Sequence, residues 1–300
     1  MLALAQVECQ SSLMTPSQPD DERGAAVALG PWREVASGVF VAVAEPHTVN
    51  LGLILGSERC LLVDTGSTPA QGAAVRESVR TVTDLPLAGA VVTHGHHDHF
   101  FGLAAFDDLE TVGHESLTER LTSPATAASA RRLGFDVAEL RGPRRPIVLA
   151  AGIDLGGRRV EVAHLGAGHT EGDVVVVVAD ADLLFTGDLI EPADAPWFDE
   201  SSNPDEWATT LDSVIGLMTE HTQAVPGHGD PVDREFVFDT RGRVASVAGE
   251  IRRLAEGGVP LDQALAQGNW AIPADHVAPG LAAAYALLGP VQARRTLPLA

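Results

Sequence analysis

Short apolar runs separated by turn-forming residues dominate the chain from Trp32 onward, and this pattern predicts strands. VASGVFVAVA, VNLGLILG and RCLLVDTG are rich in β-branched residues and follow one another closely, which favours an antiparallel meander. LAGAVVTH predicts a buried strand that runs directly into a polar cluster. PIVLA, RVEVAHL, DVVVVVA and DLLFTGD predict a second set of strands, and QAVP adds a short one.

Helical spacing appears between these sets. Residues 68–83 carry apolar positions three and four apart, with Ser67 or Thr68 as the N-cap. A second helix is expected from Asn203-Pro204 to about Glu220, because Pro is favoured at the first helical position. Residues 115–141 show no strand signal and are predicted to be a helical or loop-like insertion over a site.

The order of elements predicts three regions. Residues 1–30 are rich in Ser, Pro, Gln and Asp at their centre and are expected to form a mobile tail. Residues 31–232 contain strands with helices twice over, which favours one α/β domain of two similar halves. Residues 233–300 are predicted to be a helical C-terminal extension.

Composition excludes several kinds of chemistry. The 300 residues are 45% hydrophobic and include 30 Gly and 19 Pro, which is typical of a globular protein. The net charge is −21, and all 20 basic residues are Arg. Without Lys there is no Schiff-base lysine, P-loop lysine or Ser-Lys dyad. A surface this acidic repels phosphate backbones, so nucleic-acid binding is not expected.

Cellular location follows from weaker signals. Cys9 and Cys60 are too few for a disulfide framework. The opening MLALAQVECQ lacks the positive segment of a signal peptide, and the longest apolar run, residues 174–179, is too short to span a bilayer. A cytoplasmic protein that acts on a small molecule, without a membrane partner, is therefore expected. The oligomeric state stays open.

Potential metal ligands gather where predicted strands end. The segment THGHHDH holds four, and three more follow later strands, each with Gly within two positions: His94, His96, Asp98, His99, His169, Asp188 and His228. Five His and two Asp exceed the needs of one tetrahedral ion, so we expect two divalent metal ions. Imidazole and carboxylate without thiolate favour Zn²⁺, with Fe or Mn also compatible.

Other histidines are expected to be ordinary surface or core residues: His47, His114, His164, His221 and His276. A solvated acidic loop is the alternative for THGHHDH, but burying so many polar groups without a ligand is costly. His97 lies between the potential ligands, and it either lines the substrate pocket or points away from it.

THGHHDH, preceded by VDTG and followed in order by GHT, TGD and PGHG, resembles the metallo-β-lactamase-fold metallohydrolase superfamily over about residues 35–232. The resemblance implies a four-layer αββα sandwich with the metals at one edge. It implies that His94, His96 and His169 hold one metal and that Asp98, His99 and His228 hold the other. Asp188 would bridge the two metals, and Asp64 of VDTG would position the ligand loop.

Such a centre suits hydrolysis. Two metal ions lower the pKa of a water between them, and the resulting bridging hydroxide attacks a carbonyl that one ion polarises. Asp98 could carry the proton to the leaving group. The expected function is cleavage of an ester, lactone or thioester. The alternatives are a mononuclear iron oxidoreductase resembling the persulfide dioxygenases, β-lactam hydrolysis, and a non-catalytic metal-bound scaffold.

Details of the motifs bear on the branch of the superfamily. A bridging Asp188 is similar to glyoxalase II and the acyl-homoserine lactonases rather than to true β-lactamases. Glyoxalase II uses basic residues of its C-terminal part, where this chain has Arg but no Lys. The lactonases place a Tyr near the substrate carbonyl, and Tyr285 is the only Tyr. In the loop after Asp188, Trp197 and Phe198 either form an apolar pocket wall or pack the sandwich edge.

Overall fold

Two β-sheets form the centre of the structure, a computed structural model that describes residues 28–289. Within the described residues the first sheet has eight strands in the order β1-β3-β4-β5-β6-β7-β8, with β2 also paired to β3. These strands are β1 (Ala28–Leu29), β2 (Arg33–Ala36), β3 (Val39–Glu45), β4 (Val49–Leu55), β5 (Cys60–Val63), β6 (Leu87–Val91), β7 (Glu110–His114) and β8 (Arg145–Ile147). The antiparallel meander expected at the start is present, since β2 through β5 pair antiparallel in succession.

The second sheet has the order β13-β12-β11-β10-β9. Its strands are β9 (Ala150–Asp154), β10 (Arg159–Ala163), β11 (Val175–Val178), β12 (Leu183–Gly187) and β13 (Gln223–Pro226). The pair β12 and β13 is parallel, so the carboxyl ends of these two strands meet at one edge. PIVLA does not form one strand, because β8 ends at Ile147 in the first sheet and β9 begins at Ala150 in the second.

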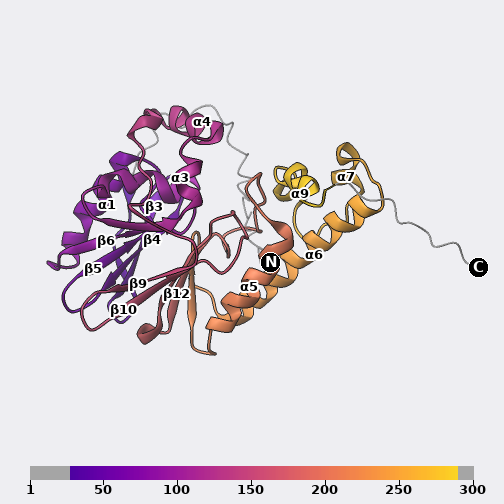
Figure 1. Ribbon diagram of the computed structural model, residues 1–300. Helices are drawn as coiled ribbons and strands as arrows, with labels where there is room; N and C mark the ends of the chain where they lie inside the picture. Colours follow the sequence, from indigo (N-terminus) through magenta and orange to yellow (C-terminus); the bar gives the residue numbers. More distant parts are fainter. Residues whose placement is uncertain (1–27, 290–300) are drawn as a thin grey trace, which may run out of the picture.

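Helices cover both outer faces (Figure 1). Beside the first sheet are α1 (Pro69–Ser78), η1 (Val79–Thr81), α2 (His97–Phe100), η2 (Phe101–Phe106), α3 (Ser116–Arg120), α4 (Pro124–Leu133) and η3 (Val137–Glu139). The short helix η4 (Ala179–Ala181) follows β11. On the other side lie α5 (Pro204–Leu217), α6 (Arg234–Glu256), α7 (Leu261–Gln267), α8 (Ala274–Val277) and α9 (Leu281–Leu287).

The predicted helix starts are correct. Thr68 caps α1 by accepting a hydrogen bond from the backbone N–H of Gln71, and Asn203 caps α5 by accepting one from Glu206. Both helices have Pro in the first turn, where its missing N–H is tolerated.

Three separate hydrophobic cores show why four layers form. Along β5, Leu61 and Val63 belong to the core between the two sheets, whereas Cys60 and Leu62 belong to the core beneath α1 and η2. In the second sheet, Leu184 faces the core beneath α5 and α6, while its neighbour Leu183 faces the other sheet. Each inner strand is therefore apolar on both faces, as expected for a sheet covered on both sides. The αββα architecture predicted from the sequence is confirmed.

Residues at both ends of the expected domain contact the sandwich. Ala28 and Leu29, expected in the tail, pair with β3, and the rest of the proposed tail lies outside the described residues. Helix α6, expected in the C-terminal extension, packs along α5 and supplies Val237, Val244 and Ile251 to the same core. Helix α6 thus shares a hydrophobic core with α5.

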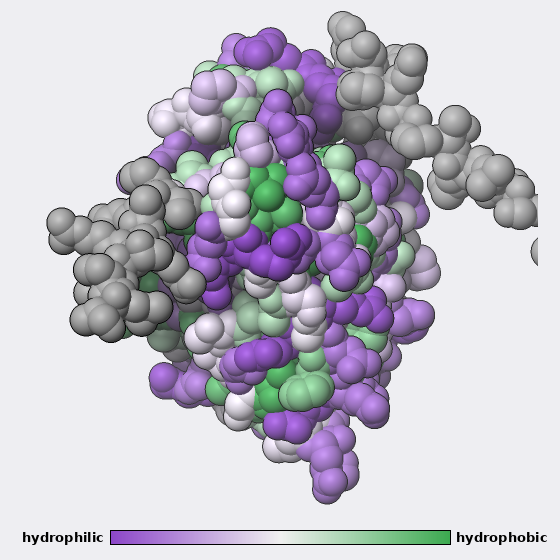
Figure 2. Space-filling view, turned by 90° about the vertical axis from the view of Figure 1, so that its right-hand side faces the viewer, coloured by the Kyte–Doolittle hydropathy of each residue, from purple (hydrophilic) through white to green (hydrophobic). Residues whose placement is uncertain are grey.

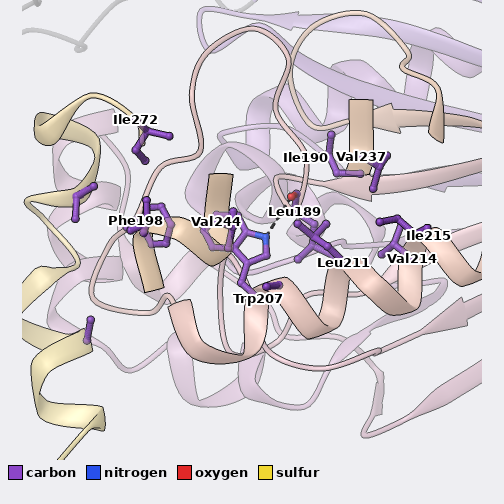
Figure 3. Close-up of a cluster of buried hydrophobic side chains, with 14 of the residues drawn as sticks. Leu189, Ile190, Phe198, Trp207, Leu211, Val214, Ile215, Val237, Val244 and Ile272 are labelled. Atoms are coloured by element: carbon purple, nitrogen blue, oxygen red, sulfur yellow. Dashed lines mark hydrogen bonds between the residues drawn. The ribbon is translucent and has the colours of Figure 1, made fainter. Parts of the chain in front are cut away.

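Trp207 is at the centre of that core (Figure 3). Its side chain is fully buried, and its indole N–H donates a 3.2 Å hydrogen bond to the carbonyl oxygen of Leu189. The bond ties α5 to the loop that follows β12. Burial of the ring thereby fixes the backbone beside Asp188.

No helix of residues 28–289 has both the length and the apolarity needed to cross a bilayer. Seen from the side of the C-terminal helices, most of the surface is hydrophilic, and hydrophobic residues form small separate patches (Figure 2).

Candidate metal centre

The seven potential ligands converge at one edge of the sandwich. His94, His96, Asp98 and His99 lie just after β6 or in α2, His169 lies between β10 and β11, Asp188 follows β12, and His228 follows β13. Their donor atoms form two groups, and within each group these atoms lie within 4.8 Å of one another. The first group comprises His94, His96, His169 and Asp188, and the second comprises Asp98, His99 and His228.

Asp188 lies between the two groups. Its Oδ2 is 3.5 Å from Nε2 of His94, in the first group, and 3.6 Å from Nε2 of His228, in the second. Its Oδ1 is 3.4 Å from Nε2 of His99. The carboxylate can therefore serve both groups at once.

The donor set fits metal ions. In the first group Nδ1 of His96 is 3.2 Å from Nε2 of His94 and 2.8 Å from Nε2 of His169. Tetrahedral coordination with bonds of about 2.0 Å requires donors about 3.3 Å apart. In addition, Nε2 of His99 and Oδ1 of Asp188 are buried without a hydrogen-bond partner, which is unusual unless a ligand contacts them.

Each of four potential ligand histidines is held by a hydrogen bond on its outer nitrogen. Nδ1 of His99 is 2.8 Å from Oδ2 of Asp64, and Nε2 of His96 is 2.8 Å from Oδ2 of Asp199. Nδ1 of His94 contacts Thr93, and Nδ1 of His169 contacts the carbonyl oxygen of Trp197. Such partners fix the ring orientation and the tautomer of a metal-bound histidine.

Asp64 also holds the strand that precedes the ligand loop. Its carboxylate accepts hydrogen bonds from the backbone N–H and the hydroxyl of Thr93, at 2.7 and 2.8 Å. The residue is buried and has a φ of 59°, a conformation uncommon outside glycine. This strained turn brings the carboxylate between Thr93 and His99.

Two carboxylates of the centre have lowered pKa values. Burial alone would raise the pKa of Asp188, but the nearby His99, His94 and His228 hold it well below its usual range. Burial likewise opposes ionisation of Asp199, and its hydrogen bond to His96 lowers that pKa. Carboxylate oxygens in contact with imidazole nitrogens form a donor set that suits a divalent ion.

A pocket of about 350 Å³ opens over these groups. Its lining comprises His96, His97, Asp98, His169, Asp188, Glu191, Asp194, Ala195, Trp197, Asp199 and His276. His97 and Trp197 thus line the pocket, whereas Phe198 does not. Phe198 is 1% exposed and packs against Trp207 in the hydrophobic core (Figure 3).

The pocket wall contains residues that the sequence did not reveal. His276, expected to be an ordinary histidine, stacks edge-on against Trp197, and its Nδ1 is 3.1 Å from the carbonyl oxygen of Ala195. Glu191 and Asp194 lie in the same loop as Trp197. The acids of this loop were visible in the sequence, but nothing in their spacing distinguished those that face the pocket.

Other expected contributors lie elsewhere. None of residues 115–141 lines the pocket; Arg120 instead donates a 2.8 Å hydrogen bond to the carbonyl oxygen of Gly95 and supports the ligand loop from outside. Tyr285 packs against the core beneath α6 and is absent from the pocket lining.

Comparisons with known proteins agree with the fold. The family model of the metallo-beta-lactamase superfamily matches residues 44–228, more than half of the chain. The human acyl-coenzyme A thioesterase MBLAC2 is 27% identical over 232 residues, covering 68% of this chain and 81% of that protein.

β-Lactamases are similar at comparable identity. A metallo-beta-lactamase type 2 of Bacillus sp. (strain 170) is 24% identical over 212 residues, covering 70% of this chain and 77% of that protein. The solved metallo-beta-lactamase from Pontibacter korlensis superposes with a TM-score of 0.58 at 21% identity, covering 72% of this chain and 99% of the other. With its two sheets, its helices and its His/Asp site, the chain belongs to the metallo-beta-lactamase superfamily of metallohydrolases.

Proposed function

We propose that the protein is a binuclear metal-dependent hydrolase, most readily with zinc, that cleaves an ester, lactone or thioester bond in a small molecule. The observation that carries this proposal is the position of Asp188 between two adjacent groups of donor atoms, at the floor of a pocket of about 350 Å³. A pocket of this volume suits a small-molecule substrate.

Residues of the pocket would have separate roles in metal binding and proton transfer. When bound, divalent ions supply a nucleophile from water at neutral pH and polarise the carbonyl oxygen of the substrate. Asp98 lines the pocket, and its Oδ2 lies 3.4 Å from Nε2 of His228. The second oxygen, Oδ1, lies 3.6 Å from Nδ1 of His97. We assign to it the transfer of a proton from water to the leaving group.

The surroundings keep this geometry rigid. Asp64 and Asp199 hold the outer nitrogens of two ligand histidines, so the donors are oriented before a metal binds. Trp197 offers an apolar surface beside the centre. The similarity to an acyl-coenzyme A thioesterase supports a thioester among the three bond types.

A substrate panel tests the proposal. Metal-loaded protein is assayed on aryl esters, lactones and acyl thioesters, then treated with a chelator and reloaded with zinc. We expect turnover of at least one class, its loss with the chelator and its return with zinc. Glu200→Ala, which changes an exposed acid in the same loop outside the pocket, is the control variant and should behave like the wild type. No turnover of any class by protein that holds two metals per chain would refute the hydrolase function.

A further inference from the structure

Apart from histidine, the ionisable side chains that line the pocket are all acidic. The lining holds five carboxylates, and no Arg is among the described residues that line it. Two of these carboxylates, Asp98 and Asp188, are potential metal ligands, and Asp199 is hydrogen-bonded to His96. Glu191 and Asp194 remain without a role in the centre.

Glu191 is the informative member of this pair. It is partly buried and forms neither a hydrogen bond nor an ion pair with any residue from 28 to 289. Burial, together with the charge of Asp188, raises the pKa of its carboxyl to about 7. The nearby His228 offsets this rise only in part, so a positively charged ligand would further stabilise the ionised carboxylate.

The second group in the pocket wall that can bind a cation is the aromatic ring of Trp197. Trp197 is 41% exposed although it lines the pocket, whereas the following Phe198 is buried. The Trp197 ring is held by His276, whose ring centroid lies 5.1 Å away, and by a 3.0 Å hydrogen bond from the N–H of Phe198 to the carbonyl oxygen of His276. An indole ring fixed in this way, in a pocket wall that also holds carboxylates, is a favourable surface for an alkylammonium group.

The site is more than a group of acids. Its floor is the buried Asp188, which is 7% exposed and whose Oδ1 has no hydrogen-bond partner. Asp194 lies at the rim, with its Oδ1 3.7 Å from Nε2 of His276. The cation surface and the candidate metal centre thus belong to one pocket, so that both can contact the same substrate molecule.

We propose that the substrate carries a positively charged group close to the bond that is cleaved, and that this cation binds between Trp197 and Glu191 with Asp194 at the rim. The proposal rests on the hydrolase function proposed above and names the substrate class. Substrates with a carboxylate at that position are disfavoured, because the described lining offers it acids and no Arg.

Three thioesters of matched shape test the inference. Acetylthiocholine carries a quaternary ammonium, 3,3-dimethylbutyl thioacetate is its uncharged isostere, and the thioacetate of 3-mercaptopropionate is anionic. With zinc-loaded protein at pH 8, we expect kcat/KM for the cationic thioester to exceed that for the neutral one about tenfold. The anionic thioester should be the poorest of the three.

Variants assign the preference to residues. Glu191→Gln and Trp197→Leu should each reduce the ratio of cationic to neutral kcat/KM severalfold, whereas Glu200→Gln should leave that ratio unchanged. Equal rates for the cationic and neutral thioesters, or an equal loss on both substrates in Glu191→Gln, would overturn the inference.

Binding separates this inference from the hydrolase function. Choline and its neutral isostere 3,3-dimethylbutanol are titrated into the zinc-loaded protein, and choline is expected to bind about tenfold more tightly. If no thioester is cleaved, the hydrolase function fails, yet a choline preference that Glu191→Gln removes would still support the cation site. Equal binding of the two alcohols would overturn the cation site.

Discussion

Asp199 gives the sharpest prediction about the metal centre, because its contact with His96 joins two segments far apart in the chain. Oδ2 of Asp199 is 2.8 Å from Nε2 of His96, and the opposite nitrogen of that ring faces His94 and His169. Both partners of the bond are less than a fifth exposed, so solvent weakens it only in part. Replacing Asp199 by Ala should therefore leave the ring free to turn and lower metal affinity.

The magnitude follows from the kind of bond. A hydrogen bond to a charged group contributes about 2 kcal/mol, which corresponds to ~30-fold in a binding constant. Removal of the carboxylate behind a metal-bound histidine typically weakens metal binding by about 10- to 100-fold. For Asp199→Ala we expect zinc affinity ~30-fold below the wild type. Asp199→Asn should lose less, because the amide still accepts a hydrogen bond, now without the charge.

Competition against a chromophoric zinc chelator measures these constants. Asp199 also accepts hydrogen bonds from the N–H and hydroxyl of Ser201, so the loop itself is affected. Asp199→Asn retains an acceptor for Ser201, and Glu200→Ala controls for the loss of charge in the loop. Wild-type affinity in Asp199→Ala would refute the reasoning. So would an equal loss in Glu200→Ala.

Asp188→Ala should remove at least one bound ion per chain, measured by elemental analysis, and unchanged metal content would contradict its place between the two donor groups. Phe198→Ala should lower the free energy of unfolding by about 3–5 kcal/mol in denaturant titrations, and Trp197→Ala by much less; equal losses would contradict the burial of Phe198. Burial raises the pKa of Asp173 to about 7, above the value of about 3.9 in an unfolded chain, so the folded chain retains a proton and its stability falls from about pH 4 to pH 7. Asp173→Asn, whose amide can still bond to Thr170, should reduce that fall in metal-free protein; a fall as steep as in the wild type would contradict the assignment.

The sequence predicted the features that depend on neighbouring residues. Short apolar runs and capped helices predicted the layers, because both patterns depend on a few consecutive positions. The THGHHDH segment could be recognised for the same reason, as its ligands share one loop. The strand β7, with the sequence ETVGH, was missed because its ends are polar and a Gly interrupts it.

Features that depend on tertiary contacts could not be predicted from the sequence. His276 lies 79 positions from Trp197 in the chain, and only the packing of α8 against the loop after β12 brings their rings together. Asp199 is one of many acids in an acidic chain, and nothing local marks it as the partner of His96. The division of PIVLA between two sheets likewise depends on which strand edge each half meets.

The metal content of protein purified without added metal, measured together with its hydrolytic activity, tests the central claim most directly. The account predicts two divalent ions per chain, with thioester, ester or lactone hydrolysis that rises in proportion to metal content. A single iron per chain without hydrolysis would contradict it and favour the oxidoreductase alternative.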